Sequence, residues 1–391
     1  MDTFNGNTTI GYTIGNNAFS NLASVRRIEY NAINSTIGTT MTARGFNNIG
    51  GTVGFDLVVG EGVTTLPQYA FRNMRINQLT LPSTITSIGR MAFAGNAQMV
   101  ELNYNPTNMS DFALATNIFY NAGTARSAGM TVNIGTNVVR IPGRIFDVNT
   151  ATNFPRISAI NIPYDGALAD IGRDAWRGND WITTITIPNS KTALSHDSFA
   201  GYFFAQLRAL EQFVVAADHP TFYAVGGILF DKGTNILRHV PRGKTGEFNI
   251  PTGTVAIADN AFLSSSLSAI TIPASVLTIG EGAFRSTRNL TTMTIPATVQ
   301  VVGAQLFVSS AIQTAVILAP ITEIAQSMFA SCAQLVSITI PATVTSVSAS
   351  AFFNANAFAT VYFMGTESQF NAITVSPTNN ARFTQANVVL V

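Results

Sequence analysis

Apolar and polar residues alternate in short stretches along the chain, and these stretches repeat. Residues 337–352 read SITIPATVTSVSASAF, and residues 269–284 read AITIPASVLTIGEGAF. In Ile338-Thr339-Ile340 the apolar positions are two apart, which predicts a short strand with one buried face. A proline follows and predicts the end of the strand, because it has no N–H to donate to a sheet. The prolines at this repeat position are Pro82, Pro163, Pro188, Pro273, Pro296 and Pro341.

An aromatic residue, usually preceded by alanine, closes each unit of the form I-T-I-P-x-x-V-x-x-I-G-x-x-A-F. Regular copies, 22 or 23 residues apart within each run, end at Phe71, Phe93, Phe262, Phe284, Phe307, Phe329 and Phe352. Looser copies end at Phe19, Phe46, Phe119, Phe146, Trp176 and Phe199, which makes about thirteen units. A unit of this size cannot bury its own apolar face, so stacked units must cover one another. The spacing therefore predicts a mainly β solenoid with a column of aromatic rings inside.

Two further local patterns predict turns. Gly89, Gly280 and Gly303 share one repeat position, which indicates a bend that needs either a positive φ or close packing. Gly226-Gly227 separates two short apolar runs, residues 223–225 and 228–230. Two such glycines between alternating runs are typical of a β-hairpin.

The chain has no Pro- or Ser-rich linker and no run of charge, so we expect one continuous array over residues 1–391. Residues 100–160 also depart from the repeat, either as a binding loop or by sequence drift. The expected parts are irregular first coils at 1–54, repeats with loops at 55–200, a hairpin insertion at 201–250, regular repeats at 251–352 and a C-terminal cap at 353–391.

Composition narrows the function classes. The chain is 47% hydrophobic and only 10% charged, and its 21 basic and 20 acidic residues give a net charge of +1. Without a Lys/Arg cluster, binding to a nucleic-acid backbone is not expected. The chain has no run of about 18 apolar residues, so a membrane-spanning helix is not predicted. Residues 1–13 lack the pattern of a signal peptide. The one cysteine, Cys332, rules out a disulfide within the chain and is expected to be a small buried residue.

Candidate catalytic residues are few. Ser195, His196 and Asp197 have the residue types of a catalytic triad. Adjacent residues on an extended segment point to alternate sides, so these three cannot converge on one another, and a turn is the expectation. The sequence therefore predicts no catalytic site, and an enzyme is not expected.

Metal and cofactor sites are not predicted either. His219 and His239 are 20 residues apart, without further ligands at the tight spacing of a metal site. Residues 231–235, DKGTN, lack the alternating carboxylates and the final Glu of an EF-hand, so a turn is favoured there.

The middle residue of each I-T-I strand faces away from the core. Stacked coils would align these hydroxyls on one face, as an uncharged docking surface for a protein or a glycan. The alternative is that threonine simply favours exposed strand positions. The residues of this candidate binding face are Thr80, Thr186, Thr271, Thr294 and Thr339.

Several segments resemble a known family. Residues 79–96, LTLPSTITSIGRMAFAGN, and 270–290, ITIPASVLTIGEGAFRSTRNL, resemble the leucine-rich repeats of BspA-like surface proteins. Residues 219–262 are similar to the hairpin-bearing unit of that family, and residues 361–373, VYFMGTESQFNAI, to its closing segment. The resemblance covers about residues 55–391 and implies a leucine-rich-repeat solenoid at the cell surface or outside the cell, in adhesion to host matrix proteins or other cells.

Two functions remain as hypotheses. The first is a non-enzymatic surface or secreted protein that binds an extracellular protein or glycan without a cofactor. The second is a structural protein that self-associates into a surface layer or filament. The low charge would suit the second, because little electrostatic repulsion opposes close lateral packing.

Overall fold

A computed structural model describes residues 3–4, 13–14, 23–31, 36–37, 50–147, 154–163, 166–187 and 207–391. The chain divides into two compact units. Unit 1 comprises Met1–Ser198, Gln206–Leu210 and Val214–Pro220, and unit 2 comprises Phe199–Ala205, Glu211–Phe213 and Thr221–Val391. One continuous array over residues 1–391 stays a prediction.

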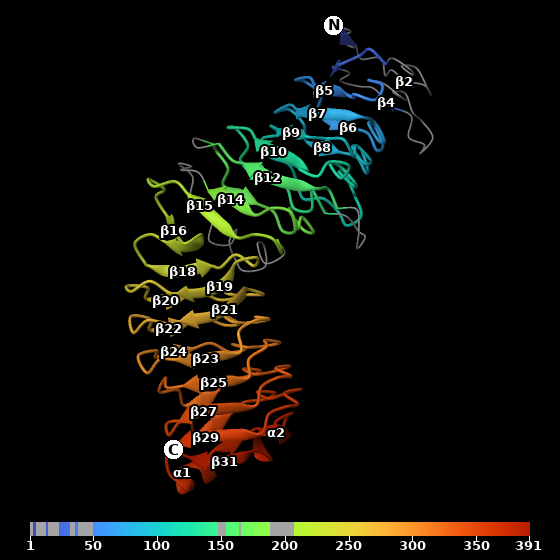
Figure 1. Ribbon diagram of the computed structural model, residues 1–391. Helices are drawn as coiled ribbons and strands as arrows, with labels where there is room; N and C mark the ends of the chain where they lie inside the picture. The colour runs from blue at the N-terminus through green and yellow to red at the C-terminus, as the bar shows by residue number, and fades with distance from the viewer. Residues whose placement is uncertain are drawn as a thin grey trace. The chain divides into compact units, whose positions relative to one another are not determined.

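In unit 1 each coil contributes one long strand to a parallel sheet (Figure 1). Its strands, in order, are β1 (Thr3–Phe4), β3 (Arg27–Tyr30), β5 (Phe55–Val59), β7 (Ile76–Leu81), β9 (Glu101–Tyr104), β10 (Met130–Ile134) and β12 (Ile157–Asn161). Equivalent residues of successive coils are register partners, as in Leu57, Leu79 and Leu102. Short parallel pairs form a second edge: β2 (Thr13–Ile14) with β4 (Thr36–Ile37), β6 (Thr65–Leu66) with β8 (Ser87–Ile88), and β11 (Arg140–Ile141) with β13 (Asp170–Ile171). The strands β14 (Thr184–Ile187) and β15 (Gln212–Val215) follow in the sequence.

The predicted hairpin lies in unit 2. Strand β16 (Phe222–Val225) pairs antiparallel with β17 (Ile228–Asp231), and Val225 lies opposite Ile228. Gly226 and Gly227 have φ of 55° and 80°. Two positive φ values in succession are the geometry of the tight turn that a two-residue hairpin favours. The hairpin prediction is therefore confirmed.

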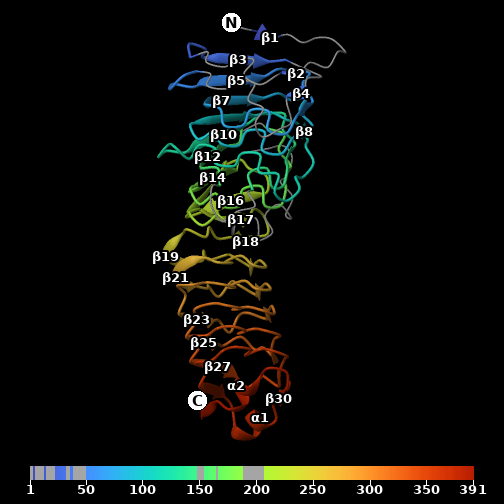
Figure 2. The same cartoon turned by 90° about the vertical axis from the view of Figure 1, so that its right-hand side faces the viewer.

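The rest of unit 2 is again made of stacked parallel strands (Figure 2). One edge continues from the hairpin through β18 (Ile236–His239), β20 (Ala256–Ile257), β22 (Thr278–Ile279) and β24 (Val301–Val302). The long strands are β19 (Thr245–Asn249) with β21 (Ser266–Thr271), and then β23 (Thr292–Ile295), β25 (Thr314–Ile317), β27 (Ser337–Pro341), β29 (Thr360–Met364) and β31 (Asn387–Leu390). Three short strands complete the unit: β26 (Glu323–Ile324), β28 (Ser346–Val347) and β30 (Thr374–Val375).

The predicted column of aromatic rings is confirmed in both units. The ring centroids of Phe71 and Phe93 are 5.7 Å apart, and those of Phe93 and Phe119 are 5.5 Å apart. In unit 2 the rings of Phe307 and Phe329 are stacked at 5.5 Å. These distances are close to the strand spacing of about 4.8 Å, so each coil adds one ring. The buried rings are Phe71, Phe93, Phe119, Phe146 and Trp176 in unit 1, and Phe262, Phe284, Phe307, Phe329 and Phe352 in unit 2. The predicted members Phe19, Phe46 and Phe199 lie outside the described residues.

Residues with positive φ lie two positions before each buried ring and, where the structure describes them, two positions after it. Around Phe262, for example, Asn260 has φ 54° and Ser264 has φ 59°. The equivalent residue before Phe307 is Gln305, at φ 58°. Positive φ is uncommon outside glycine, asparagine and aspartate, so a repeated fold holds these residues where local preference alone would not.

The glycine position predicted from the repeat is used for close packing. None of the three glycines, Gly89, Gly280 and Gly303, has a φ in the left-handed region. A Cβ at Gly303 would lie 2.5 Å from the backbone nitrogen of Glu281 in the preceding coil. Of the two explanations for this glycine, close packing is therefore correct and positive φ is not.

The C-terminal segment covers the last ring of unit 2. Helix α1 (Glu367–Asn371) begins at Thr366, whose Oγ1 accepts a hydrogen bond from the backbone of Gln369. Helix α2 (Ala381–Thr384) places the buried Phe383 ring 5.3 Å from Phe352. A repeat array needs such an end piece, because its last coil has no further neighbour.

Removing one ring from the column should be costly. We expect Phe284→Ala to lower the free energy of unfolding by about 3–5 kcal/mol, the usual cost of truncating a buried Phe. The matched control is Phe353→Ala, since Phe353 is 43% exposed. Urea unfolding measures both variants, and an unchanged midpoint for Phe284→Ala would contradict the burial of this ring.

Candidate binding face

The outward side chains of the unit 1 sheet form a hydrogen-bonded row. Thr80, Asn103, Asn133 and Asn161 are successive register partners on β7, β9, β10 and β12. Asn133 Nδ2 donates to Asn103 Oδ1 at 2.9 Å, and Asn161 Nδ2 donates to Asn133 Oδ1 at 2.8 Å. We call Asn103, Asn133 and Asn161 the asparagine row. Each bond orients one amide against the next, so the row presents its donors and acceptors in a fixed order.

Sequence reasoning missed the asparagine row, although a signal for it exists. Residues 102–104, LNY, and 132–134, VNI, have the same period of two as the I-T-I strands, with asparagine at the middle position.

The five predicted threonines face outward but do not form a continuous row of hydroxyls. On β27, Thr339 has Val316 and Tyr362 as its register partners, and on β7, Thr80 lies beside Val58. Apolar and amide side chains therefore interrupt the hydroxyls. Three of the threonines are exposed, Thr186, Thr271 and Thr294, and two are half-buried, Thr80 and Thr339.

A groove in unit 2 brings two of these threonines together. It has a volume of about 370 Å³ and lies between β21 and β23. Strand β21 pairs with β19, and β23 pairs with β25, but in the described part of the chain no backbone pairing joins β21 to β23. Its lining includes Ala269, Ile270, Thr271, Thr292, Thr294, Thr314 and Val316. We call Thr271, Thr292, Thr294 and Thr314 the threonine groove; the predicted residues Thr80, Thr186 and Thr339 are not among its lining.

The irregular stretch around residues 101–160 is tied to neighbouring coils. Arg140 Nη2 lies 2.6 Å from Asp111 Oδ1, and its Nε lies 2.6 Å from Asp170 Oδ2. Its Nη1 donates to the backbone oxygen of Met109 at 3.1 Å. Asp111 also accepts a hydrogen bond from the backbone nitrogen of Gly143 at 2.6 Å. These bonds give Arg140 and Asp111 a structural role in fixing the stretch.

The lone thiol has the properties of a core residue. Cys332 is fully buried, and its Sγ donates to the backbone oxygen of Phe307 at 2.9 Å. Burial raises the pKa of the Cys332 thiol to about 11. A thiol that stays protonated is a poor nucleophile, which agrees with the predicted structural role. The other candidate catalytic residues, Ser195, His196 and Asp197, lie outside the described residues.

The structure describes two of the three histidines, His219 and His239, and residues 231–235. His219 and His239 are both fully buried. The backbone oxygen of Asp231 accepts from Asn235 in the predicted turn, and its Oδ2 accepts from Arg238 Nε at 2.6 Å. Across the residues that the structure covers, no group of three or more metal-ligating side chains occurs. In the same residues no helix has the length and apolar character that crossing a bilayer requires.

The family model for the BspA-type leucine-rich repeat region matches this chain in six copies, over residues 64–205 and 249–376. The chain belongs to the BspA-type leucine-rich repeat family. The resemblance found in residues 79–96 and 270–290, and the leucine-rich-repeat fold that it implied, are thereby confirmed. No match is found among curated proteins.

Solved structures of bacterial leucine-rich-repeat proteins are similar to this BspA-type chain. A leucine-rich repeat protein from Eubacterium ventriosum is 20% identical, with 78% of this chain and 72% of that chain covered and a TM-score of 0.48. A leucine rich cell surface protein from Faecalibacterium prausnitzii is 19% identical, with 95% and 92% covered and a TM-score of 0.46. The pneumococcal vaccine antigen PcpA is 14% identical, with 100% and 94% covered and a TM-score of 0.51. Identities this low speak to the fold alone.

Stability should depend on pH through His239. Burial lowers its pKa from 6.5 to about 4 in the folded chain, while the unfolded chain takes up the proton near pH 6.5. Between these values the unfolded state binds more protons, so the stabilising contribution is complete above about pH 6.5 and is lost as the pH falls toward 4. We expect the Tm of the wild type to fall more steeply over this range than that of His239→Phe. Parallel Tm curves for the two proteins would contradict this assignment.

Proposed function

We propose that this BspA-type chain is a non-enzymatic cell-surface or secreted binding protein. It docks an extracellular protein or glycan on the outward faces of its sheets, in adhesion to host matrix or to other cells. The observation that carries the proposal is the threonine groove, a concave site among otherwise regular outward strands.

The lining of the groove favours a neutral, hydrogen-bonding partner. Four hydroxyls lie beside the apolar side chains of Ala269 and Val316, and no charged residue contributes to the lining. Each hydroxyl can donate and accept, and one hydrogen bond typically adds about 0.5–1.5 kcal/mol net. Several such bonds on a preformed surface can hold a peptide or a sugar without charge pairing.

The repeat architecture supports the same conclusion. Coils stacked at about 4.8 Å present long rows of outward side chains, which is how solenoids build extended binding surfaces. The asparagine row is such a surface in unit 1.

Binding to an immobilised extracellular-matrix extract tests the proposal. We expect Thr294→Arg, which fills the groove with a long charged side chain, to weaken binding at least about tenfold, the effect of losing one or two hydrogen bonds. The matched control is Thr278→Arg, because Thr278 is exposed on β22 of the same unit, outside the groove lining. Equal binding by both variants would contradict docking in the groove. Light scattering that grows with protein concentration, without matrix binding, would instead support a self-assembling layer.

A further inference from the structure

A second surface of unit 1 lies at the turns that lead into its long strands. Four successive coils place residues 123–129, 154–156, 178–183 and 207–209 at this corner. The backbone oxygen of Arg156 accepts from Met130, directly after the first turn, at 2.8 Å. Asp180 Oδ1 accepts from the backbone nitrogen of Arg208 at 3.3 Å, which joins the third turn to the fourth. The turns therefore stack in register with the coils.

An exposed tryptophan is the central feature of this corner. Trp181 is 50% exposed, although most large aromatic residues of the chain are in the core. The guanidinium carbon of Arg156 lies 3.7 Å from the centroid of its ring. This contact holds the guanidinium against the indole, while half of the tryptophan remains exposed. A rigid aromatic face held outward by a cation is a preformed platform for a flat apolar ligand surface.

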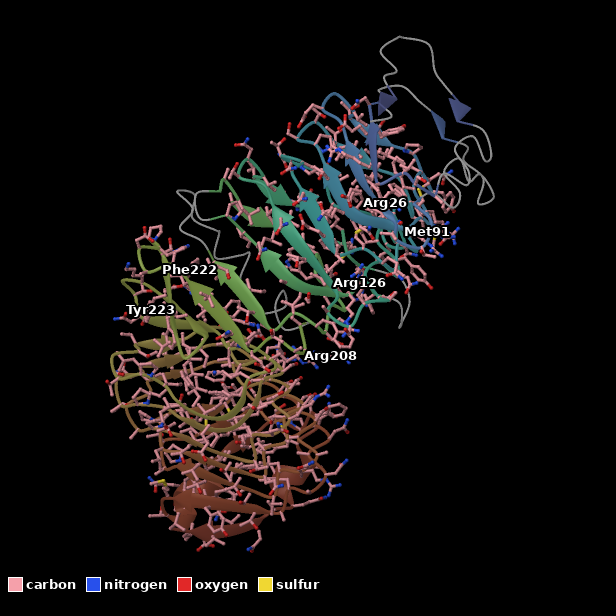
Figure 3. The ribbon with its side chains drawn as sticks, turned by 45° about the horizontal axis from the view of Figure 1, so that its top comes forward. Arg26, Met91, Arg126, Arg208, Phe222 and Tyr223 are labelled. Carbon is pink, nitrogen blue, oxygen red and sulfur yellow. The ribbon has the colours of Figure 1, made fainter. Side chains whose placement is uncertain are left out.

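Positive charge surrounds the platform. Arg126 is exposed, and its Nε donates to the backbone oxygen of Gln98 at 3.1 Å, which orients the guanidinium. Arg208 has a side chain 69% exposed and lies 3.8 Å from Asp180, a loose surface pair. The described residues of these turns carry three guanidiniums and the carboxylate of Asp180, and Glu211 follows the fourth turn directly before β15. Figure 3 labels Arg126 and Arg208 along one margin of unit 1. We call Arg126, Arg156, Trp181 and Arg208 the Arg–Trp corner.

The fold itself does not require this charge. Three turns of unit 2, residues 310–313, 333–336 and 355–359, contain no Asp, Glu, Lys or Arg, yet they lead into regular strands, whereas the turn before β23 carries Arg288. In two of these turns Gln313 Nε2 donates to Gln334 Oε1 at 3.5 Å. Charge at the corner of unit 1 is therefore available for a ligand.

We propose that the Arg–Trp corner binds an anionic polysaccharide, one that carries sulfate or carboxylate groups on pyranose rings. The exposed face of Trp181 packs against the apolar C–H face of one sugar ring. Arg126 and Arg208 pair with sulfates or carboxylates on either side, since the planar guanidinium matches both groups with two parallel hydrogen bonds. The stacked turns give a track for a linear polymer, and the aromatic platform favours a polysaccharide over a simple polyanion. This site is distinct from the threonine groove and does not depend on the function proposed for it.

Heparin is the probe that tests the inference, with neutral dextran as the comparison ligand. We expect the full chain to bind heparin, and not dextran, at about 0.15 M salt. Trp181→Ala should weaken binding about tenfold, whereas Trp181→Phe, which keeps a flat ring, should stay within about threefold of the wild type. The double variant Arg126→Ala/Arg208→Ala should bind more weakly and with a shallower dependence on salt. The charge-matched control is Arg288→Ala, because Arg288 is exposed in unit 2.

Four results would overturn the inference. If heparin binds no more strongly than dextran, the corner is not a site for an anionic polysaccharide. Equal weakening by Arg288→Ala means that net charge, and not this corner, attracts heparin. If a folded Trp181→Ala protein binds heparin with unchanged affinity, Trp181 does not stack on the sugar. Tighter binding to a duplex DNA of equal charge shows a general polyanion surface instead. The groove variants should bind heparin like the wild type even if they no longer bind the matrix extract, so the two proposals can fail separately.

Discussion

Each coil of either unit covers the aromatic ring of the coil before it, and that contact is what turns a repeated sequence into a stable fold. Phe71 and Phe93 in unit 1, and Phe307 and Phe329 in unit 2, are fully buried and nearly parallel at 5.5–5.7 Å. Burying one such side chain adds about 1.5–3 kcal/mol. A single unit of 22 or 23 residues has no way to bury its own ring, so stability is shared between neighbours.

This constraint leaves the outward positions free to differ. In the unit 1 sheet an inner row stays apolar from coil to coil, as at Leu57, Leu79 and Leu102. In the five-stranded sheet of unit 2, Thr339 faces outward between Val316 and Tyr362. The asparagine row, the threonine groove and the Arg–Trp corner are all built at positions that the ring column does not fix. Function in this chain is proposed to reside there, while the repeated geometry of the coil supplies the spacing.

Much of the fold could be predicted from the sequence, because its signals are local and repeated. The period of two in the strands, the proline after them, the aromatic every 22 or 23 residues and Gly226-Gly227 each correspond to an observed element. The left-handed residues around the rings could not be predicted, since Gln305 has no local preference for positive φ and is held there by neighbouring coils.

The surfaces were harder to predict for a physical reason. The threonine groove exists because β21 and β23 do not pair, which is a tertiary property that no single repeat shows. In the Arg–Trp corner, Arg156 contacts Trp181. The two residues lie in turns of irregular units, where the sequence spacing does not predict which positions of neighbouring coils lie side by side. Residue type alone therefore predicted which threonines face outward, but not which side chains lie beside them.

Coupling between rings tests the central claim most directly. A double-mutant cycle with Phe307→Leu and Phe329→Leu, whose rings are in contact, should give a coupling free energy of about 0.5–1.5 kcal/mol in urea unfolding. The cycle with Phe284→Leu and Phe329→Leu, which are separated by one ring, should be additive within about 0.5 kcal/mol. Equal coupling in the two cycles, or none in the first, would contradict a column in which each coil depends on its immediate neighbour.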